Sequence, residues 1–452
     1  MKKYIYIVRT LISIFVTILF GFAYANSTFN NYSPATLEEK RMGNKVLQSI
    51  WDDHIVIKDI ESQIYLKNLL KKLTLASDQP DRHYDIFLIK DDSINAFASW
   101  NGYIGVHNAL ITFSESESEL AAIIAHEISH ISQDHLKRHR DKIEKQKILT
   151  LGGIIASVMV NDENLNEVIA TTTIANDLQN QINYTREHEW EADNFSVKIL
   201  EKTDFNIDGL GTFFNRIKEE KSAVEYLKTH PLNINRVANS QSRAENNKRN
   251  HLSSFDYETL KIRLKNSKEL NLNLNNLDLD LYSKSYFSFQ DNKLHEARKY
   301  VDRLLESNKN FSTLLLAGRI YGAQRQVRES EEFFFLASEI LDNEVVRYYQ
   351  SEMYLTNKKP LKALKLLKNF VKLNEPLAYT EILLGQIYLN LSEQDRFQFH
   401  TGNSELIKGR HEVAIKHYSL AQTLTQNKDF YDLLDSKIKL VDEEKELLKI
   451  KD

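Results

Sequence analysis

The sequence contains no cysteine among its 452 residues. No disulfide can form, and no lipid can be attached through a cysteine thiol. The fold must therefore be held together by side-chain packing and by any metal that it binds. An excess of charge of one sign is also lacking, because the formal net charge is −4. A mildly acidic surface of mixed sign gives no reason to expect nucleic acid as a partner.

Long hydrophobic runs are scarce beyond the N-terminus, where an apolar core at 11–22 follows Lys2, Lys3 and Arg9. Ala23-Tyr24-Ala25 then offers an A-x-A cleavage site. This order is typical of a cleaved secretory signal peptide at 1–25, which predicts a periplasmic protein. An uncleaved membrane anchor is the alternative, although the core is short for a span. Cleavage would remove three basic and no acidic residues, so the net charge would fall from −4 to −7.

A second apolar segment, 149–160, contains Gly152 and Gly153. At about twelve residues it is too short to span a bilayer. We expect it to lie near the active site, where it would cover the cleft or make peripheral contact with a membrane surface. An ordinary buried helix is the alternative.

The most informative motif is His126-Glu127-Ile128-Ser129-His130. Histidines at positions i and i+4 share one face of a helix, so their imidazoles can converge on one metal ion. Glu127 would lie beside that ion and could accept a proton from water. Capping boxes at 114–117 and 116–119 predict a helix, and apolar residues at 120–125 predict its burial. The motif indicates a zinc-dependent hydrolase, and the alternative is a helix with two partly exposed histidines.

A third protein ligand is required, because catalytic zinc takes three and leaves one position for water. The HExxHxxGxxH pattern fails, since Gln133 and Leu136 replace its glycine and its last histidine. Glu189 and Asp193 instead lie one turn apart in a probable helix at 185–193. One carboxylate could complete the metal site, and the other could accept the spare N–H of a ligand histidine. A solvated acidic helix is the alternative.

The segments AAIIAHEISHISQDH and REHEWEADNF together resemble the HtpX and CAAX-prenyl-endopeptidase family of gluzincin metallopeptidases. The resemblance implies that His126, His130 and Glu189 bind one Zn²⁺ per chain. It also implies that Glu127 is the general base and that Asp193 supports a ligand histidine. Within that family, the chain is similar to periplasmic members that carry a C-terminal tetratricopeptide array and assist outer-membrane β-barrel assembly.

The segment from Thr229 to Arg236 resembles the family's HPxxxxR motif. The resemblance implies that His230 and Arg236 are catalytic and hydrogen-bond the oxyanion of the tetrahedral intermediate. In related members the histidine is also proposed to bind zinc in a latent state. Without the resemblance, a His-Pro pair predicts only a turn followed by a helix start.

Strand formers at 84–89, 95–99 and 103–106 surround the hairpin signal Asn101-Gly102. We expect a short sheet beside the HExxH helix, with an edge strand facing the metal. An extended substrate could pair with that edge. The resemblance implies this role for four residues: Asn95, Ala96, Phe97 and Ala98. A purely structural hairpin is the alternative.

Small residues recur at intervals of 33 or 34 in the C-terminal part, at Ser285, Gly318, Ser351 and Gly385. A tyrosine follows three residues after each of the last three. This period is typical of tetratricopeptide helix pairs, which bind polypeptides on a curved surface. The register slips near Phe397, which predicts an insertion, 396–410, that projects from the array.

The expected fold is therefore α+β and mostly α. A zincin-like metallopeptidase domain with a short sheet and the HExxH helix would be followed by an all-α tetratricopeptide solenoid. The expected divisions are a signal peptide at 1–25, a peptidase domain at 26–264, a linker at 265–282 and repeats at 283–452. The chain is too long for a single core.

Two functions from different classes are compatible with these motifs. The first is a secreted zinc endopeptidase that acts on polypeptides, chiefly outer-membrane β-barrel proteins, and docks on their assembly complex. The second is a periplasmic chaperone or adaptor whose metal site is latent or structural. The intact base Glu127 favours the first, because a structural site needs ligands and no proton acceptor.

Overall fold

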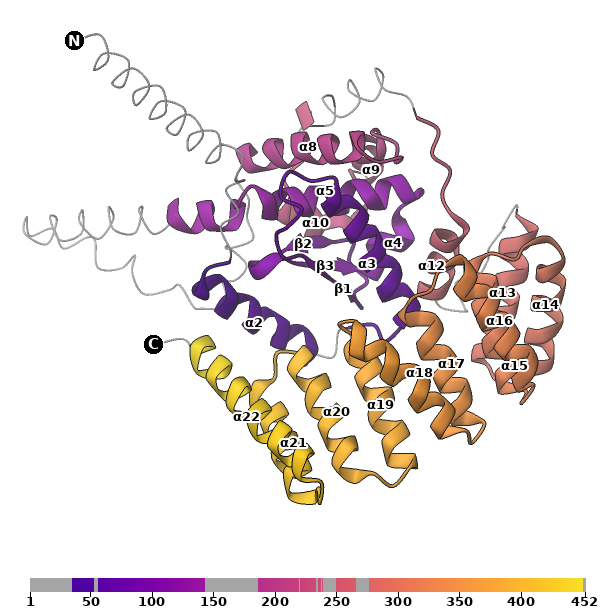
Figure 1. Cartoon of the computed structure of the whole chain (residues 1–452). Coiled ribbons are helices and arrows are strands. Elements are labelled where there is room, and N and C mark those ends of the chain that lie inside the picture. Colours follow the sequence, from indigo (N-terminus) through magenta and orange to yellow (C-terminus); the bar gives the residue numbers. More distant parts are fainter. Residues whose placement is uncertain are drawn as a thin grey trace, which may run out of the picture.

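A computed structural model describes residues 35–52, 56–142, 186–218, 220–232, 235, 236, 238, 249–265 and 276–449. The α+β, mostly helical fold expected from the sequence is confirmed (Figure 1). The predicted signal peptide and the apolar segment 149–160 lie outside these ranges. Within them, no helix is long and apolar enough to cross a membrane. The helices of the peptidase part include α2 (Leu37–Asp52), α3 (Ile60–Leu75), α4 (Asn108–Phe113), α5 (Glu117–Ser132), α8 (Arg186–Glu201), α9 (Gly209–Ile217), η3 (Lys221–Ala223), α10 (Val224–Thr229) and α12 (Phe255–Leu264).

The sheet has three strands, β1 (Asp85–Ile89), β2 (Ala96–Ala98) and β3 (Tyr103–His107), in the order β1-β3-β2. β3 runs parallel to β1 and antiparallel to β2, so β2 is an edge strand. The predicted hairpin turns through η1 (Trp100–Gly102), where Asn101 and Gly102 have φ angles of 60° and 76°. Asparagine and glycine tolerate this left-handed region best. A Cβ on Gly102 would also lie 1.9 Å from the His83 carbonyl oxygen, so glycine is required there.

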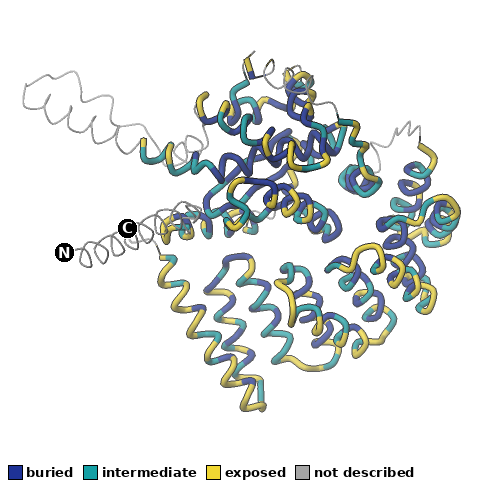
Figure 2. The backbone as a smooth tube through the Cα atoms, turned by 45° about the horizontal axis from the view of Figure 1, so that its top comes forward, coloured by how far each residue is buried: buried dark blue, intermediate teal, exposed yellow. Residues whose placement is uncertain are grey.

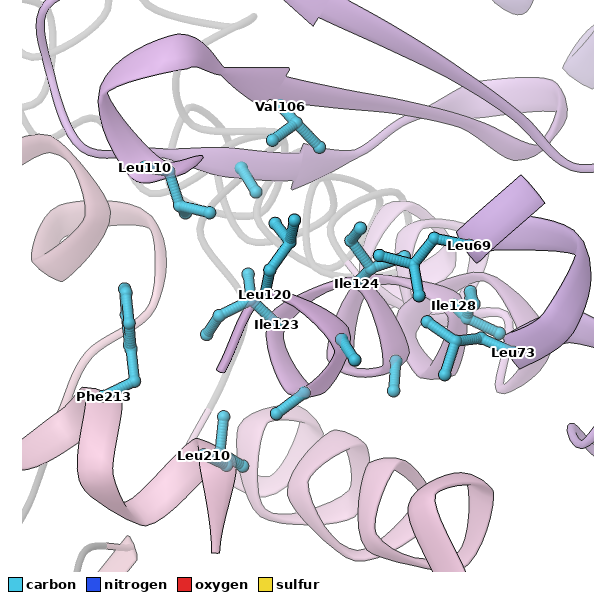
Figure 3. Close-up of a cluster of buried hydrophobic side chains, with 14 of the residues drawn as sticks. Leu69, Leu73, Val106, Leu110, Leu120, Ile123, Ile124, Ile128, Leu210 and Phe213 are labelled. Atoms are coloured by element: carbon cyan, nitrogen blue, oxygen red, sulfur yellow. The ribbon is translucent and has the colours of Figure 1, made fainter. Parts of the chain in front are cut away.

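Helix α5 is buried along its whole length. Its N-cap, Ser116, accepts a hydrogen bond from the Glu119 N–H, as the capping box predicts. Figure 3 shows its apolar side chains between Val106 of the sheet, Leu69 of α3 and Phe213 of α9. Each buried leucine or isoleucine contributes about 1.5–3 kcal/mol to folding. The motif helix is therefore the centre of the peptidase core and not a surface feature.

The repeat array follows as α13 (Leu277–Gln290), α14 (Leu294–Ser307), α15 (Phe311–Ala323), α16 (Val327–Ile340), α17 (Glu344–Thr356), α18 (Pro360–Leu373), α19 (Ala378–Asn390), α20 (Gln394–Ile407), α21 (His411–Leu424) and α22 (Lys428–Leu448). The predicted small residues lie where paired helices touch. The Ser330 hydroxyl donates to the Gly318 carbonyl at 2.7 Å, and the Phe334 ring lies directly over Gly318. Close approach of this kind explains why the period of small residues is visible in the sequence.

The expectation that 396–410 projects as an insertion is wrong. These residues lie mainly in α20, which packs between α19 and α21 with no break in the helical alternation. Phe397 fits beside Gly385, and Gly402 supplies the close contact instead, against the Tyr418 ring. Helix α20 thus presents the large Phe397 to α19 and the small Gly402 to α21, which looks like a slip when only the small residues are counted.

The array contacts the peptidase part at both ends (Figure 1). Near its start, Ile60 and Ile64 of α3 belong to the same apolar core as the helices around α15. Near its end, the Gln48 amide of α2 donates to the Gly409 carbonyl at 2.6 Å, and Arg41 donates to the Leu447 carbonyl at 2.7 Å. Helix α13 begins at Leu277, inside the range expected for the linker.

Candidate metal centre

His126 and His130 point toward each other from one face of α5. Their Nε2 atoms are 2.9 Å apart, and both side chains are fully buried. The spacing i, i+4 on a straight helix produces this convergence. Two imidazole nitrogens facing each other inside a core fit best when a cation lies between them.

Glu189 reaches the two histidines from α8, as its pattern with Asp193 suggested. Its carboxylate oxygens lie 3.4 Å from His126 Nε2 and 3.4 Å from His130 Nε2. Zinc bonds of about 2.0–2.1 Å in a tetrahedron place donor atoms roughly 3.3 Å apart. The three donors thus have the separations, the burial and the chemistry that suit one zinc ion.

His230, the residue after α10, is the fourth member of this group. Its Nδ1 lies 3.3 Å from both oxygens of Glu189, and its Nε2 lies 3.5 Å from Glu127 Oε1. Potential ligand atoms of His126, His130, Glu189 and His230 all lie within 4.8 Å of one another. This is the one such group among the described residues.

Glu127 is fully buried next to these residues. Burial raises the pKa of its carboxyl group, while the neighbouring His230 and His126 rings act in the opposite direction. A carboxyl group with a raised pKa is better matched to proton transfer near neutral pH than an ordinary glutamate.

The pKa of Glu189 is shifted in the opposite direction. Burial opposes its ionisation, but His230, His126 and His130 outweigh burial and hold its pKa well below the usual value.

Asp193 and Arg236 lie behind the four residues. The Asp193 Oδ1 atom is 3.0 Å from His126 Nδ1, the position expected for a carboxylate that orients a ligand imidazole. Arg236 is buried and donates to both Asp193 oxygens, at 2.7 and 2.8 Å, and its Nη1 lies 2.8 Å from Glu189. Its guanidinium therefore holds carboxylates in place, and its contact with an oxyanion stays a prediction.

Sequence reasoning missed His135. Its ring is buried, and its Nδ1 lies 2.7 Å from His130 Nδ1. Burial, with added effects of the His130 and His188 rings, lowers the pKa of His135 to about 3. The histidine was visible in the motif segment, but five residues after His130 it would not share that residue's face in a continuous helix.

The expected substrate strand lies at the sheet edge beside α5. Ala96 and Ala98 are buried, and Phe97 covers Gly105 of β3. Asn95 is also buried, and its side chain accepts a hydrogen bond from the Thr229 hydroxyl at 3.5 Å. The start of β2 is thereby connected to the residue that precedes His230.

Residues 61–244 match Peptidase family M48, which spans the sheet, α5, α8 and His230. The match assigns a Peptidase family M48 domain to this part of the chain. The beta-barrel assembly-enhancing protease of Escherichia coli (strain K12) is 27% identical over 410 residues, which cover 85% of this chain and 84% of that protein. A putative beta-barrel assembly-enhancing protease of Vibrio cholerae is 32% identical over 219 residues, covering 47% of this chain and 45% of that protein.

A solved tetratricopeptide repeat protein from Parabacteroides merdae is 19% identical, with a TM-score of 0.27, and covers 57% of this chain and 93% of that one. The assignment of the array rests on its helices and their period. The M48 domain indicates that the chain is a metalloprotease, and the buried group of three histidines and one glutamate is its candidate metal centre.

Proposed function

We propose that this M48 metalloprotease is a zinc-dependent endopeptidase in which His126, His130 and Glu189 bind the ion. The observation that carries the proposal is the set of donor separations, 2.9, 3.4 and 3.4 Å, inside a closed core. A zinc ion there would supply Lewis-acid chemistry for hydrolysis of a peptide bond. Asp193 would keep His126 in the tautomer whose Nε2 faces the ion, and Arg236 would hold both carboxylates.

The role of Glu127 is to move one proton. During hydrolysis a water oxygen bonds to the scissile carbonyl carbon, the C–N bond breaks, and the departing nitrogen must gain a proton. Glu127 is placed to take that proton from the water and to deliver it to the amine. Burial raises the pKa of its carboxyl group, which makes Glu127 a stronger base for the first half of this transfer.

The edge strand β2 is the proposed binding site for an extended substrate. Every second residue along this strand forms backbone hydrogen bonds with β3. The Asn95 carbonyl accepts from the His107 N–H, and the Ser99 N–H donates to the Tyr103 carbonyl. The backbone groups of Ala96, one residue further along, consequently point to the opposite side. Alanines at 96 and 98 keep this side of the strand close to α5 and hence to Glu127.

The compartment and the substrates are part of the same proposal. The predicted signal peptide would direct the enzyme to the periplasm, and two relatives are named for assembly of β-barrel proteins. We infer that misassembled outer-membrane β-barrel proteins are substrates and that the array binds them or their assembly complex. Cleavage after Ala25 would be checked by N-terminal sequencing of the periplasmic fraction.

His230 favours a second candidate, a chaperone or adaptor whose centre is latent. A site with four protein donors has the coordination of structural zinc, whereas a catalytic site keeps one position open. If His230 is such a fourth ligand, hydrolysis requires it to move away. We therefore expect His230→Ala to raise basal cleavage of an unfolded protein. An unchanged or lower rate would count against His230 as a fourth ligand that keeps the centre latent.

The decisive experiment replaces Glu127 by glutamine. We expect the variant to bind one zinc per chain, because no ligand changes, and to lose about 10²–10⁴-fold in proteolysis. The matched control is Glu115→Gln, an exposed position just before α5, which should cleave like the wild type. Equal proteolysis by Glu127→Gln would refute the endopeptidase. Retained suppression of substrate aggregation by both variants would then favour the chaperone.

A further inference from the structure

The two histidines of the motif differ in what holds their second ring nitrogen. His126 Nδ1 faces the Asp193 carboxylate at 3.0 Å. His130 Nδ1 lies 2.7 Å from another imidazole nitrogen, Nδ1 of His135. One of two nitrogens this close must donate a proton to the other.

The contacts on the far side of His135 decide the direction. Its Nε2 lies 3.1 Å from Glu191 Oε2, and that same oxygen accepts from Arg138 at 2.7 Å. A carboxylate accepts hydrogen bonds, so the His135 proton resides on Nε2 and its Nδ1 is an acceptor. The chain of hydrogen bonds then runs from His130 Nδ1–H to His135 and from His135 Nε2–H to Glu191. This order leaves His130 Nε2 free of a proton on the side of His126 and Glu189.

A change in backbone direction after α5 allows the contact between His130 and His135 to form. Helix α5 ends at Ser132, and Asp134 has a φ angle of 53°. In an unbroken helix, residue 135 would lie about 140° around the axis from His130. The left-handed residue breaks that geometry. The His188 ring, stacked at 4.5 Å and 13°, packs against His135 from α8.

We infer that His135 is a positioning residue that accepts the His130 Nδ1–H and thereby aims His130 Nε2 at the metal, with Glu191 fixing the tautomer of His135. The inference rests on the zinc ligands of the proposed function. It assigns the two ligand histidines unlike supports: a carboxylate for one, and an imidazole backed by a carboxylate for the other. Partners of this kind typically change metal affinity by 10–100-fold.

The test measures zinc affinity of the full-length protein by competition with a chromogenic chelator. His135→Phe keeps a ring and removes both nitrogens, and it should weaken zinc binding about 10–100-fold. His135→Asn keeps an acceptor near the Nδ1 position and should lose no more than about threefold, the equivalent of one weakened neutral hydrogen bond. His188→Phe, the matched control, keeps the stacked ring and leaves the three hydrogen bonds intact, so its affinity should equal that of the wild type.

Melting of the zinc-free proteins separates positioning from packing. His135→Phe and His188→Phe should melt together with the wild type when no metal is present. A wild-type zinc affinity in His135→Phe would overturn the inference. It would also be overturned if His135→Phe and His135→Asn lost the same zinc affinity and both melted at a lower temperature without zinc. Should His135→Phe fail to fold, Glu191→Leu, a partly exposed position, provides the second test.

Glu191→Leu removes the hydrogen bond from His135 Nε2 to Glu191. This change should weaken zinc binding by a smaller factor, about two- to tenfold. An unchanged affinity there would likewise overturn the inference. A wild-type protein that takes up no zinc would refute the proposed function itself, together with this inference. Zinc binding by the wild type with no effect of any His135 or Glu191 variant would refute the inference alone.

Discussion

The peptidase part and the repeat array bury polar groups in different ways. In the peptidase part, three imidazoles and one carboxylate converge within 4.8 Å, and a buried arginine neutralises the carboxylates behind them. In the array, buried carboxylates are single and locally bonded: Glu344 accepts from the Leu377 N–H at 2.7 Å, and Glu381 pairs with His400 at 2.6 Å. Figure 2 shows buried residues throughout the peptidase part and an alternation of buried and exposed residues along the array helices.

The peptidase part thus holds a buried polar centre, whereas the array relies on the packing of small residues against aromatic rings. A cluster of like groups in a dry core is costly unless a cation or a counter-charge is present. Small residues against aromatic rings carry no such cost, and they hold helices at a constant spacing. Disturbing the peptidase centre should therefore change activity and stability together, whereas disturbing the array should change local packing.

Metal removal should give the largest effect. We expect a chelator to abolish proteolysis and to destabilise the peptidase part, by about 4 kcal/mol if zinc had been present at 1,000 times its Kd. Hydrogen exchange should speed up in α5 and α8 and stay unchanged in α19–α21. Equal acceleration in both regions, or none in either, would contradict the expectation that the metal stabilises the peptidase part and not the array.

Arg236→Met should have the next largest effect. It leaves the buried carboxylates of Asp193 and Glu189 without their guanidinium, a change that typically costs 3–5 kcal/mol. The matched control is Arg298→Met in the array, where the partly exposed pair with Asp302 should contribute less than about 1 kcal/mol. Urea unfolding of the zinc-free proteins measures both. Similar losses for the two variants would show that the two regions do not differ in this way.

The smallest effect is expected from a pair of glycines within the array. A Cβ on Gly402 would lie 2.5 Å from the Tyr418 ring, so Gly402→Ala should destabilise by about 1–3 kcal/mol. At Gly385 the nearest atom would be 3.3 Å away, and Gly385→Ala should be neutral or stabilising because alanine favours helix by about 0.8–1.0 kcal/mol. Thermal melting ranks the two, and the reverse order would refute the packing assigned to α20.

Local patterns predicted much of the fold. The hairpin at Asn101-Gly102 is present, because only a few residue types tolerate its left-handed turn. The 33-residue period predicted helix pairs, because close helix contacts admit only small side chains. The same rule failed at 396–410, because helix α20 carries the large Phe397 against α19 and places its small residue in close contact, Gly402, further along the same helix. A rule based on a fixed 33-residue spacing misses a small residue at another position of the helix.

What the sequence by itself determined is the local geometry: two histidines on one helical face, a buried helix to carry them, a hairpin and a repeat. Each depends on the 3.6- or 2-residue periodicity of the backbone or on a turn of a few residues. The meeting of Glu189 with the motif histidines was expected from the family resemblance. Only the tertiary structure decided which other distant groups meet: Arg236 with Asp193, His135 with Glu191, and α2 with the end of the array. Those contacts depend on how whole helices pack and where the chain breaks, as at Asp134, and no spacing along the chain encodes them.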